Sequence, residues 1–198
     1  MIKRTLAAVI RLATGVRKQP ASTLPDGPVI YFANHTSHLD FLSIWAALPP
    51  TIREHTRPIA AKDYWNKSPL HRWIAASVFQ AHLIDRNTSA RTDNPLEPLK
   101  QILNKGNSII IFPEGTRSRY GSPNKFKSGI YHLTKNNPKI PLIPVYLENM
   151  NRILPAGEFL PIPLLGQIEF RPPIKLIDGE TKNNFLLRAQ QSVQHDDQ

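Results

Sequence analysis

The chain of 198 residues has no cysteine, only 9 glycines and no long hydrophobic run. The missing cysteines exclude a disulfide framework, a thiol nucleophile, an iron–sulfur cluster and a cysteine-based zinc site. No stretch without Asp, Glu, Lys or Arg exceeds 13 residues, and the uncharged stretches at residues 41–52 and 73–84 are shorter than the about 18 residues of a membrane-spanning helix. The apolar run at residues 6–10 ends at Arg11 with no small-residue cleavage site, so we do not expect a secretory signal peptide.

Acidic residues are also scarce, because 15 Asp and Glu stand against 25 Lys and Arg, for a formal net charge of +10. Such a charge suits nucleic acid, an anionic membrane or a small phosphorylated substrate. A hydrophobic content of 40% excludes a disordered chain. The length is that of one domain of ordinary size.

The first twenty residues contain no acid and have an amphipathic pattern. Helical spacing places Ile2, Leu6, Val9, Ile10, Ala13 and Val16 on one side and Arg4, Arg11 and Lys18 on the other. The pattern is typical of a helix in the membrane interface with its cations towards anionic headgroups, and equally of a helix packed on the domain. We predict an interfacial helix over residues 1–20, a main domain over 21–180, and a C-terminal helix and tail over 181–198.

Alternating strand and helix patterns predict the fold. Strands are expected at residues 28–33, 58–61, 82–84, 108–112, 142–147 and 167–171, and helices at 40–48, 70–79, 99–104 and 128–135. Residues 87–98 are expected to form an exposed loop, and residues 190–198 a frayed tail. Most of these strands are apolar without alternation, which favours a single α/β domain with a largely parallel twisted sheet flanked by helices.

Two polar clusters follow predicted strands, at residues 34–40 and 113–118. Ligands of parallel sheets bind at the carboxyl ends of the strands. In the first cluster, His35 can act as a general base if Asp40 orients it, which requires His35 to lie in the turn before the helix that holds Asp40. An exposed histidine and a helix-terminal aspartate would show the same spacing. His35, His38 and Asp40 have the residue types of metal ligands, but no further strong ligand stands out, so we predict no metal.

The second cluster runs from Glu114 to Ser118. Gly115 allows the backbone to approach a ligand, and Arg117 can bind phosphate with two hydrogen bonds. Neither a P-loop nor a serine nucleophile elbow is present. Arg86, which also follows a predicted strand, is a second candidate for a phosphate ligand. Six basic residues and no acid lie between residues 117 and 139.

These blocks resemble, in order, those of the glycerolipid acyltransferases, specifically the lysophosphatidate (1-acylglycerol-3-phosphate) acyltransferases. Asn34, His35 and Asp40 match the Asn-His-x4-Asp (HX4D) block, and residues 84–86 match Ile-Asp-Arg. Residues 112–118 match Phe-Pro-Glu-Gly-Thr-Arg-Ser, and residues 143–145 match an apolar strand centred on Pro144. Lys127 belongs to a Phe-Lys-x-Gly sequence that also looks familial. The resemblance covers roughly residues 28–175.

The resemblance implies an enzyme of phospholipid biosynthesis that transfers a fatty acyl group to the 2-hydroxyl of lysophosphatidate, giving phosphatidate. The implied donor is a thioester of coenzyme A or of acyl carrier protein, with no resident cofactor and no bound nucleic acid. His35 would be the base and Asp40 its orienting partner. Arg86, Glu114, Gly115, Thr116 and Arg117 would bind the acceptor, supported by Asn34, Ser118, Lys127 and Pro144.

A peripheral attachment to an anionic membrane through residues 2–18, on the cytoplasmic face of the inner or plasma membrane, is the expected location. Two alternatives remain. One is an acyltransferase of the same superfamily that acts on glycerol 3-phosphate or another lysolipid. The other is a non-catalytic basic protein that binds membrane or nucleic acid, which would explain the charge but not the ordered motifs.

Overall fold

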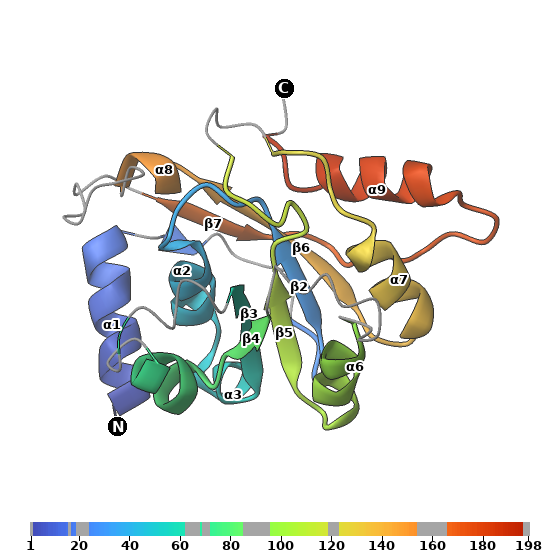
Figure 1. Cartoon of the computed structure of the whole chain (residues 1–198). Coiled ribbons are helices and arrows are strands. Elements are labelled where there is room, and N and C mark those ends of the chain that lie inside the picture. Colours follow the sequence, from blue (N-terminus) through green and yellow to red (C-terminus); the bar gives the residue numbers. More distant parts are fainter. Residues whose placement is uncertain are drawn as a thin grey trace.

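The computed structural model describes residues 2–15, 17–18, 24–61, 68, 72–84, 96–118, 123–153 and 166–195. Its centre is a seven-stranded sheet with strand order β1-β7-β6-β2-β5-β3-β4 (Figure 1). The strands are β1 (Arg17–Lys18), β2 (Ile30–Ala33), β3 (Thr56–Ala61), β4 (His82–Ile84), β5 (Ser108–Ile111), β6 (Leu142–Glu148) and β7 (Gln167–Phe170). Only β6 and β7 pair antiparallel among neighbours, so the sheet is largely parallel, as predicted.

Helices cover both faces of the sheet (Figure 1). One hydrophobic core lies beneath α1 (Ile2–Thr14), α2 (Asp40–Ala47), α8 (Met150–Ile153) and a π-helix over Ile74–Phe79, while α3 (Pro50–Glu54) follows α2 in the chain. The other core lies beneath α6 (Glu97–Asn104), α7 (Gly129–Asn136) and α9 (Lys182–Gln191). Strand β2 contributes Tyr31 and Ala33 to the first core and Ile30 and Phe32 to the second. Burial on both faces explains why β2 is continuously apolar.

The connections of the two central strands leave the sheet in opposite directions. Strand β2 leads into α2 on one face, and its neighbour β5 leads into α7 on the other. Open α/β sheets bind ligands where their connections diverge in this way, so a ligand-binding crevice is expected between the carboxyl ends of β2 and β5. The two polar clusters of the sequence follow these two strands, so the fold brings them together.

Two helix boundaries differ from prediction because of proline. Helix α2 ends before Pro49, as expected, but Pro50 then begins α3. Helix α6 likewise begins at Glu97 and includes Pro98, within the region expected to be a loop. Proline has no N–H to lose in the first helical turn, and its fixed φ suits that position. Proline, the residue type that ends a helix, can therefore also stand in the first turn of the next one.

Other differences lie along residues 70–79 and at the C-terminal end. The predicted helix over residues 70–79 is a π-helix over Ile74–Phe79 that ends at Gln80 with a positive φ of 49°. The expected frayed tail is wrong for residues 190–195. Helix α9 continues to Gln191, and Val193 beyond it is fully buried. The apolar contact of Val193 with the second core holds this segment against the domain.

Helix α1 packs on the first core through Leu6, Ala7 and Ile10. The packed side therefore includes Leu6 and Ile10 of the predicted apolar face. Val9, which was predicted on the same face, is 55% exposed, and Leu12 is 88% exposed. Among the described residues, no helix combines the length and the apolar character that crossing a bilayer requires.

Candidate active site

The loop between β2 and α2 is organised by the carboxylate of Asp40, the first residue of α2. Its Oδ2 accepts hydrogen bonds from the backbone N–H groups of Thr36 (2.7 Å) and Ser37 (2.8 Å). It also lies 2.8 Å from Nδ1 of His35. The chain thus folds back so that His35 meets Asp40, although on a continuous helix residues five apart would point in different directions. The predicted pairing of these two residues is confirmed, and the helix starts at Asp40, as predicted.

The contact selects the tautomer of the neutral imidazole ring. A carboxylate Oδ2 can only accept a hydrogen bond from its partner, so in the neutral ring Nδ1 of His35 carries the hydrogen and Nε2 has the lone pair. Asp40 is fully buried, whereas the side chain of His35 is 17% exposed. The ring stacks on Phe112, at the end of β5, with centroids 4.2 Å apart. These contacts orient a histidine that can take a proton at Nε2.

Glu114, after β5, joins three segments of the site. Its Oε1 accepts the N–H of His35 at 2.7 Å, and its Oε2 accepts the N–H of Asn124 at 2.7 Å. Ser118 adds a second link, because its N–H donates to the carbonyl oxygen of His35 at 2.7 Å. Burial raises the pKa of the Glu114 carboxyl, and the backbone N–H bonds of Asn124 and His35 and the charge of His35 oppose this rise.

Asn34 connects the same loop to the other neighbour of β2. Its side-chain amide donates to the carbonyl oxygen of Leu147 on β6 at 2.9 Å, and its Oδ1 accepts the N–H of Leu147 at 2.8 Å. Asn34 is buried, so both bonds are shielded from water. The backbone of His35 is therefore held from β5 through Glu114 and Ser118, and from β6 through Asn34.

Lys127 lies against the loop after β5. Gly115 has a φ of +74°, and a Cβ placed on it would lie 2.6 Å from Nζ of Lys127. The N–H of Lys127 donates to the carbonyl oxygen of Pro113 at 2.9 Å. Glycine is favoured at position 115 by its backbone conformation, and a Cβ there would also displace the end of the Lys127 side chain. Thr116 and Arg117 follow on the same loop and are exposed.

The structure accounts for the remaining predicted residues as follows. Arg86 lies outside the described residues. Pro144 lies within β6, paired with Phe32 of β2, and so contributes to the sheet and not to the crevice. Within the described ranges, no three His, Asp or Glu residues are grouped as a metal site would require. Phe112, which stacks on His35, was not among the predicted site residues, although it begins the block at residues 112–118.

The hydrogen bonds of Glu114 predict that this residue positions His35 and does not bind the substrate. Glutamine has one acceptor oxygen, so Glu114→Gln places an amide NH2 against one of the two N–H donors. Because the side chain at position 114 is buried, this NH2 is a buried donor without a partner, which costs about 1–3 kcal/mol, or about 10–10² in rate if it displaces His35 in the transition state. We expect kcat to fall by about that factor while the KM for the acceptor changes little.

Steady-state kinetics test this expectation. Glu97→Gln is the matched control, because the side chain of Glu97 on α6 is exposed. A large rise in the acceptor KM with an unchanged kcat would contradict a positioning role and indicate that Glu114 contacts the acceptor.

A buried carboxylate that orients a histidine, beside a loop carrying exposed cations, defines a site able to deprotonate a hydroxyl group of an anionic molecule. Comparison with known proteins gives the class a name. A family model described as Acyltransferase matches residues 15–148, which is more than half of the chain. The chain belongs to this acyltransferase family.

The chain is similar to 1-acyl-sn-glycerol-3-phosphate acyltransferase alpha of Mus musculus, with 31% identity over 86% of this chain and 58% of that protein. It is 30% identical to the 1-acyl-sn-glycerol-3-phosphate acyltransferase of Limnanthes douglasii over 75% of this chain and 51% of that protein. The chain spans about half the length of these curated relatives. The crystal structure of the 1-acyl-sn-glycerophosphate (LPA) acyltransferase PlsC from Thermotoga maritima has the same fold. The two structures match with a TM-score of 0.76 and 20% sequence identity, over 97% of this chain and 75% of the Thermotoga maritima chain.

Proposed function

We propose that the protein is a 1-acylglycerol-3-phosphate O-acyltransferase, which acylates the 2-hydroxyl of lysophosphatidate to give phosphatidate. The observation that carries the proposal is the His35–Asp40 contact of 2.8 Å, because it leaves Nε2 free to accept a hydroxyl proton. The names of the relatives support lysophosphatidate as the acceptor. The donor is a thioester of coenzyme A or of acyl carrier protein.

The proposed reaction is a direct transfer. Nε2 of His35 takes the proton of the acceptor hydroxyl as its oxygen attacks the thioester carbonyl. A C–O bond forms, the C–S bond breaks, and the proton passes from the imidazolium to the departing thiolate. The negative charge of Asp40 stabilises the imidazolium between these steps. No covalent acyl-enzyme is needed, so a cysteine nucleophile is not required.

An acceptor panel tests this proposal against its nearest alternative. The purified protein is supplied with one acyl-coenzyme A and equal concentrations of lysophosphatidate, glycerol 3-phosphate and lysophosphatidylcholine. We expect lysophosphatidate to be acylated with the highest kcat/KM. A preference for another acceptor would place the protein elsewhere in the superfamily, and binding to anionic surfaces without any acyl transfer would identify a non-catalytic protein.

The phosphate of the acceptor is proposed to contact Lys127 and Arg117 at the loop after β5. Losing one charge-assisted hydrogen bond costs about 1.5–3 kcal/mol, so Lys127→Ala should raise the acceptor KM by about tenfold or more. Lys125→Ala is a matched control, since Lys125 is an exposed lysine two residues away. Titration of lysophosphatidate against both variants checks this, and equal KM values for the two would remove Lys127 from the phosphate site.

We further propose that the outer side of α1 attaches the protein to the cytoplasmic face of an anionic membrane. Leu12 and Val9 are exposed on this side, and Arg4 and Arg11 are exposed beside them. This arrangement allows the apolar residues to enter the interface while the cations meet headgroups.

Leu12→Glu removes the burial of one leucine in the interface, worth about 1.5–3 kcal/mol. We expect at least about tenfold weaker binding to vesicles that contain anionic lipid. Leu187→Glu on α9 is the matched control, because Leu187 is 56% exposed over the opposite face of the sheet. Sedimentation with vesicles measures both, and a loss of binding confined to the Leu187 variant would assign the membrane surface to the other face.

A further inference from the structure

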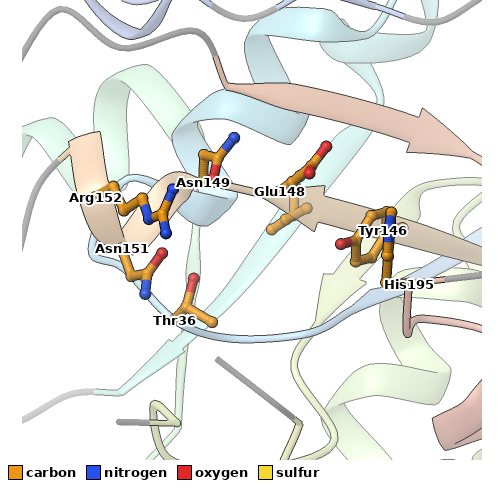
Figure 2. A pocket seen from close by; sticks show the side chains of 8 residues that line it. Thr36, Tyr146, Glu148, Asn149, Asn151, Arg152 and His195 are labelled. Carbon is orange, nitrogen blue, oxygen red and sulfur yellow. The ribbon is translucent and has the colours of Figure 1, made fainter. Parts of the chain in front are cut away.

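A cavity of about 480 Å³ lies on the β6 side of the loop that carries His35. Its walls include Thr36, which directly follows His35, and Tyr146 at the end of β6. Asn149, Asn151 and Arg152 come from the turn after β6 and from α8, and His195 comes from the C-terminal segment (Figure 2). Its volume is in the range of small-molecule sites, about 300–1,000 Å³.

The cavity and the loop after β5 lie on opposite sides of β2. The sheet order places β2 between β6 and β5. His35 stacks on Phe112 on the β5 side, whereas Thr36 faces the cavity with residues of β6. The transfer reaction needs two substrates that meet at His35. If the acceptor phosphate binds at Lys127 beyond β5, the space beyond β6 remains for the other substrate.

The cavity walls are held in place by the fold. The two hydrogen bonds between Asn34 and Leu147 tie the end of β6 to the His35 loop. The centroid of the Tyr146 ring lies 6.1 Å from that of His195, and the guanidinium of Arg171 lies 5.1 Å from the Tyr146 ring centroid. Arg171 also donates to the carbonyl oxygen of Ser192 at 3.2 Å, which anchors the C-terminal segment beside the cavity.

The chemistry of the lining is polar but close to neutral. Arg152 and Glu148 contribute one charge of each sign, and the other polar groups are amides, a phenol, a hydroxyl and an imidazole. Glu148 and Arg152 point in different directions in Figure 2. Among the residues that the structure describes, Arg152 makes no ion pair. Such a site suits an uncharged chain rich in amides that ends in one phosphate, and not the doubly charged phosphate monoester of the acceptor.

We propose that this cavity binds the phosphopantetheine arm of the thioester donor, an inference that rests on the proposed function. The arm carries two amides and a hydroxyl group, which the side chains of Asn149, Asn151 and Tyr146 can meet with hydrogen bonds. Its phosphate, shared by coenzyme A and by acyl carrier protein, pairs with Arg152 at the rim. The thioester at its other end then lies past Thr36, beside the hydroxyl that His35 deprotonates.

Kinetics of Arg152→Ala and Asn151→Leu test the assignment. Both variants should raise the KM for the donor, Arg152→Ala by about tenfold, while the KM for lysophosphatidate and kcat change less than about twofold. Lys105→Ala is the control, since Lys105 is an exposed cation that precedes β5 at the opposite end of the strands. A rise in the lysophosphatidate KM instead, or no change in either KM, overturns the inference.

A comparison of two acyl donors tests whether Arg152 contacts the phosphopantetheine arm or another part of the donor. The effect of Arg152→Ala should be the same within about twofold for acyl-coenzyme A and for acyl carrier protein loaded with the same chain, because both contain the phosphorylated arm. An effect confined to acyl-coenzyme A would place Arg152 against the nucleotide and overturn the assignment to the arm.

Direct binding separates this inference from the proposed function. Coenzyme A is titrated into wild-type protein and into Arg152→Ala by calorimetry, without any acceptor. We expect about tenfold weaker binding to the variant, even if the acceptor proves not to be lysophosphatidate. Equal affinities for the two proteins would refute the cavity assignment, even if the acyl transfer itself is established.

Discussion

Replacing His35 with alanine is expected to lower kcat by ~10²–10⁴-fold, the usual contribution of a positioned general base. The fold should persist, because the bonds that shape the loop at this position are made by its backbone. Its N–H binds Glu114, and its carbonyl oxygen accepts from Ser118. The Asp40 carboxylate also keeps its bonds to the N–H groups of Thr36 and Ser37.

The measurement is turnover with saturating lysophosphatidate and donor, together with thermal unfolding of the same samples. His132→Ala on α7 is the matched control, because His132 is an exposed histidine away from the crevice. Near-normal turnover of the His35 variant would exclude this residue as the base. A large loss in thermal stability would indicate that the variant lost activity by unfolding.

The second large effect is expected at Asp40, where two substitutions should differ. Asp40→Ala removes the acceptor for His35 Nδ1 and for two backbone N–H groups, so the ring loses its orientation and its fixed tautomer. We expect a fall in kcat of ~10²–10⁴-fold. Measured stability should also fall, because buried donors are left without partners.

Asp40→Asn should be milder, for a reason visible in the structure. Only Oδ2 of Asp40 makes hydrogen bonds, whereas Oδ1 is buried and without a partner among the described residues. The asparagine oxygen can take the place of Oδ2 and its NH2 the place of Oδ1, where no hydrogen bond is lost. The tautomer of His35 is then kept and only the charge is lost, which weakens a charge-assisted bond by about half.

We therefore expect a fall of about tenfold for Asp40→Asn. Steady-state kinetics of both variants measure the difference. Equal losses for Asn and Ala would show that the charge, and not the orientation of the ring, accounts for the effect of Asp40.

Most strands of the sheet could be predicted from the sequence because the central strands are buried on both faces. Residues 28–33, 108–112 and 142–147 are apolar runs bounded by polar or turn residues. The first two ranges contain the strands found there, and β6 extends one residue beyond the third. The strand order was not predictable, since it depends on which face each crossover helix covers. The main local errors lie at prolines, because Pro50 begins a short helix that was not predicted, and Pro98 lies in the first turn of a helix that begins two residues before the predicted start.

The pairing of His35 with Asp40 could be predicted because the turn that joins them is local. The links of Glu114 to His35 and of Asn34 to Leu147 could not, since they cross 79 and 113 residues of sequence. Glu114 was expected to shape the acceptor site, whereas both of its oxygens bind backbone N–H groups. The cavity beside Thr36 left no sequence signal, because it combines the end of β6, α8 and a C-terminal segment that was expected to be frayed.

The most direct test is the position and origin of the acyl chain in the product. Purified protein is incubated with 1-acyl lysophosphatidate and a thioester that carries an isotopically labelled chain, in parallel with His35→Ala, and the lipids are examined by mass spectrometry. We predict phosphatidate labelled at the 2-position from the wild-type protein and at least about 10²-fold less from the variant. Equal yields from the two proteins, or label transferred only to other acceptors, would contradict the account.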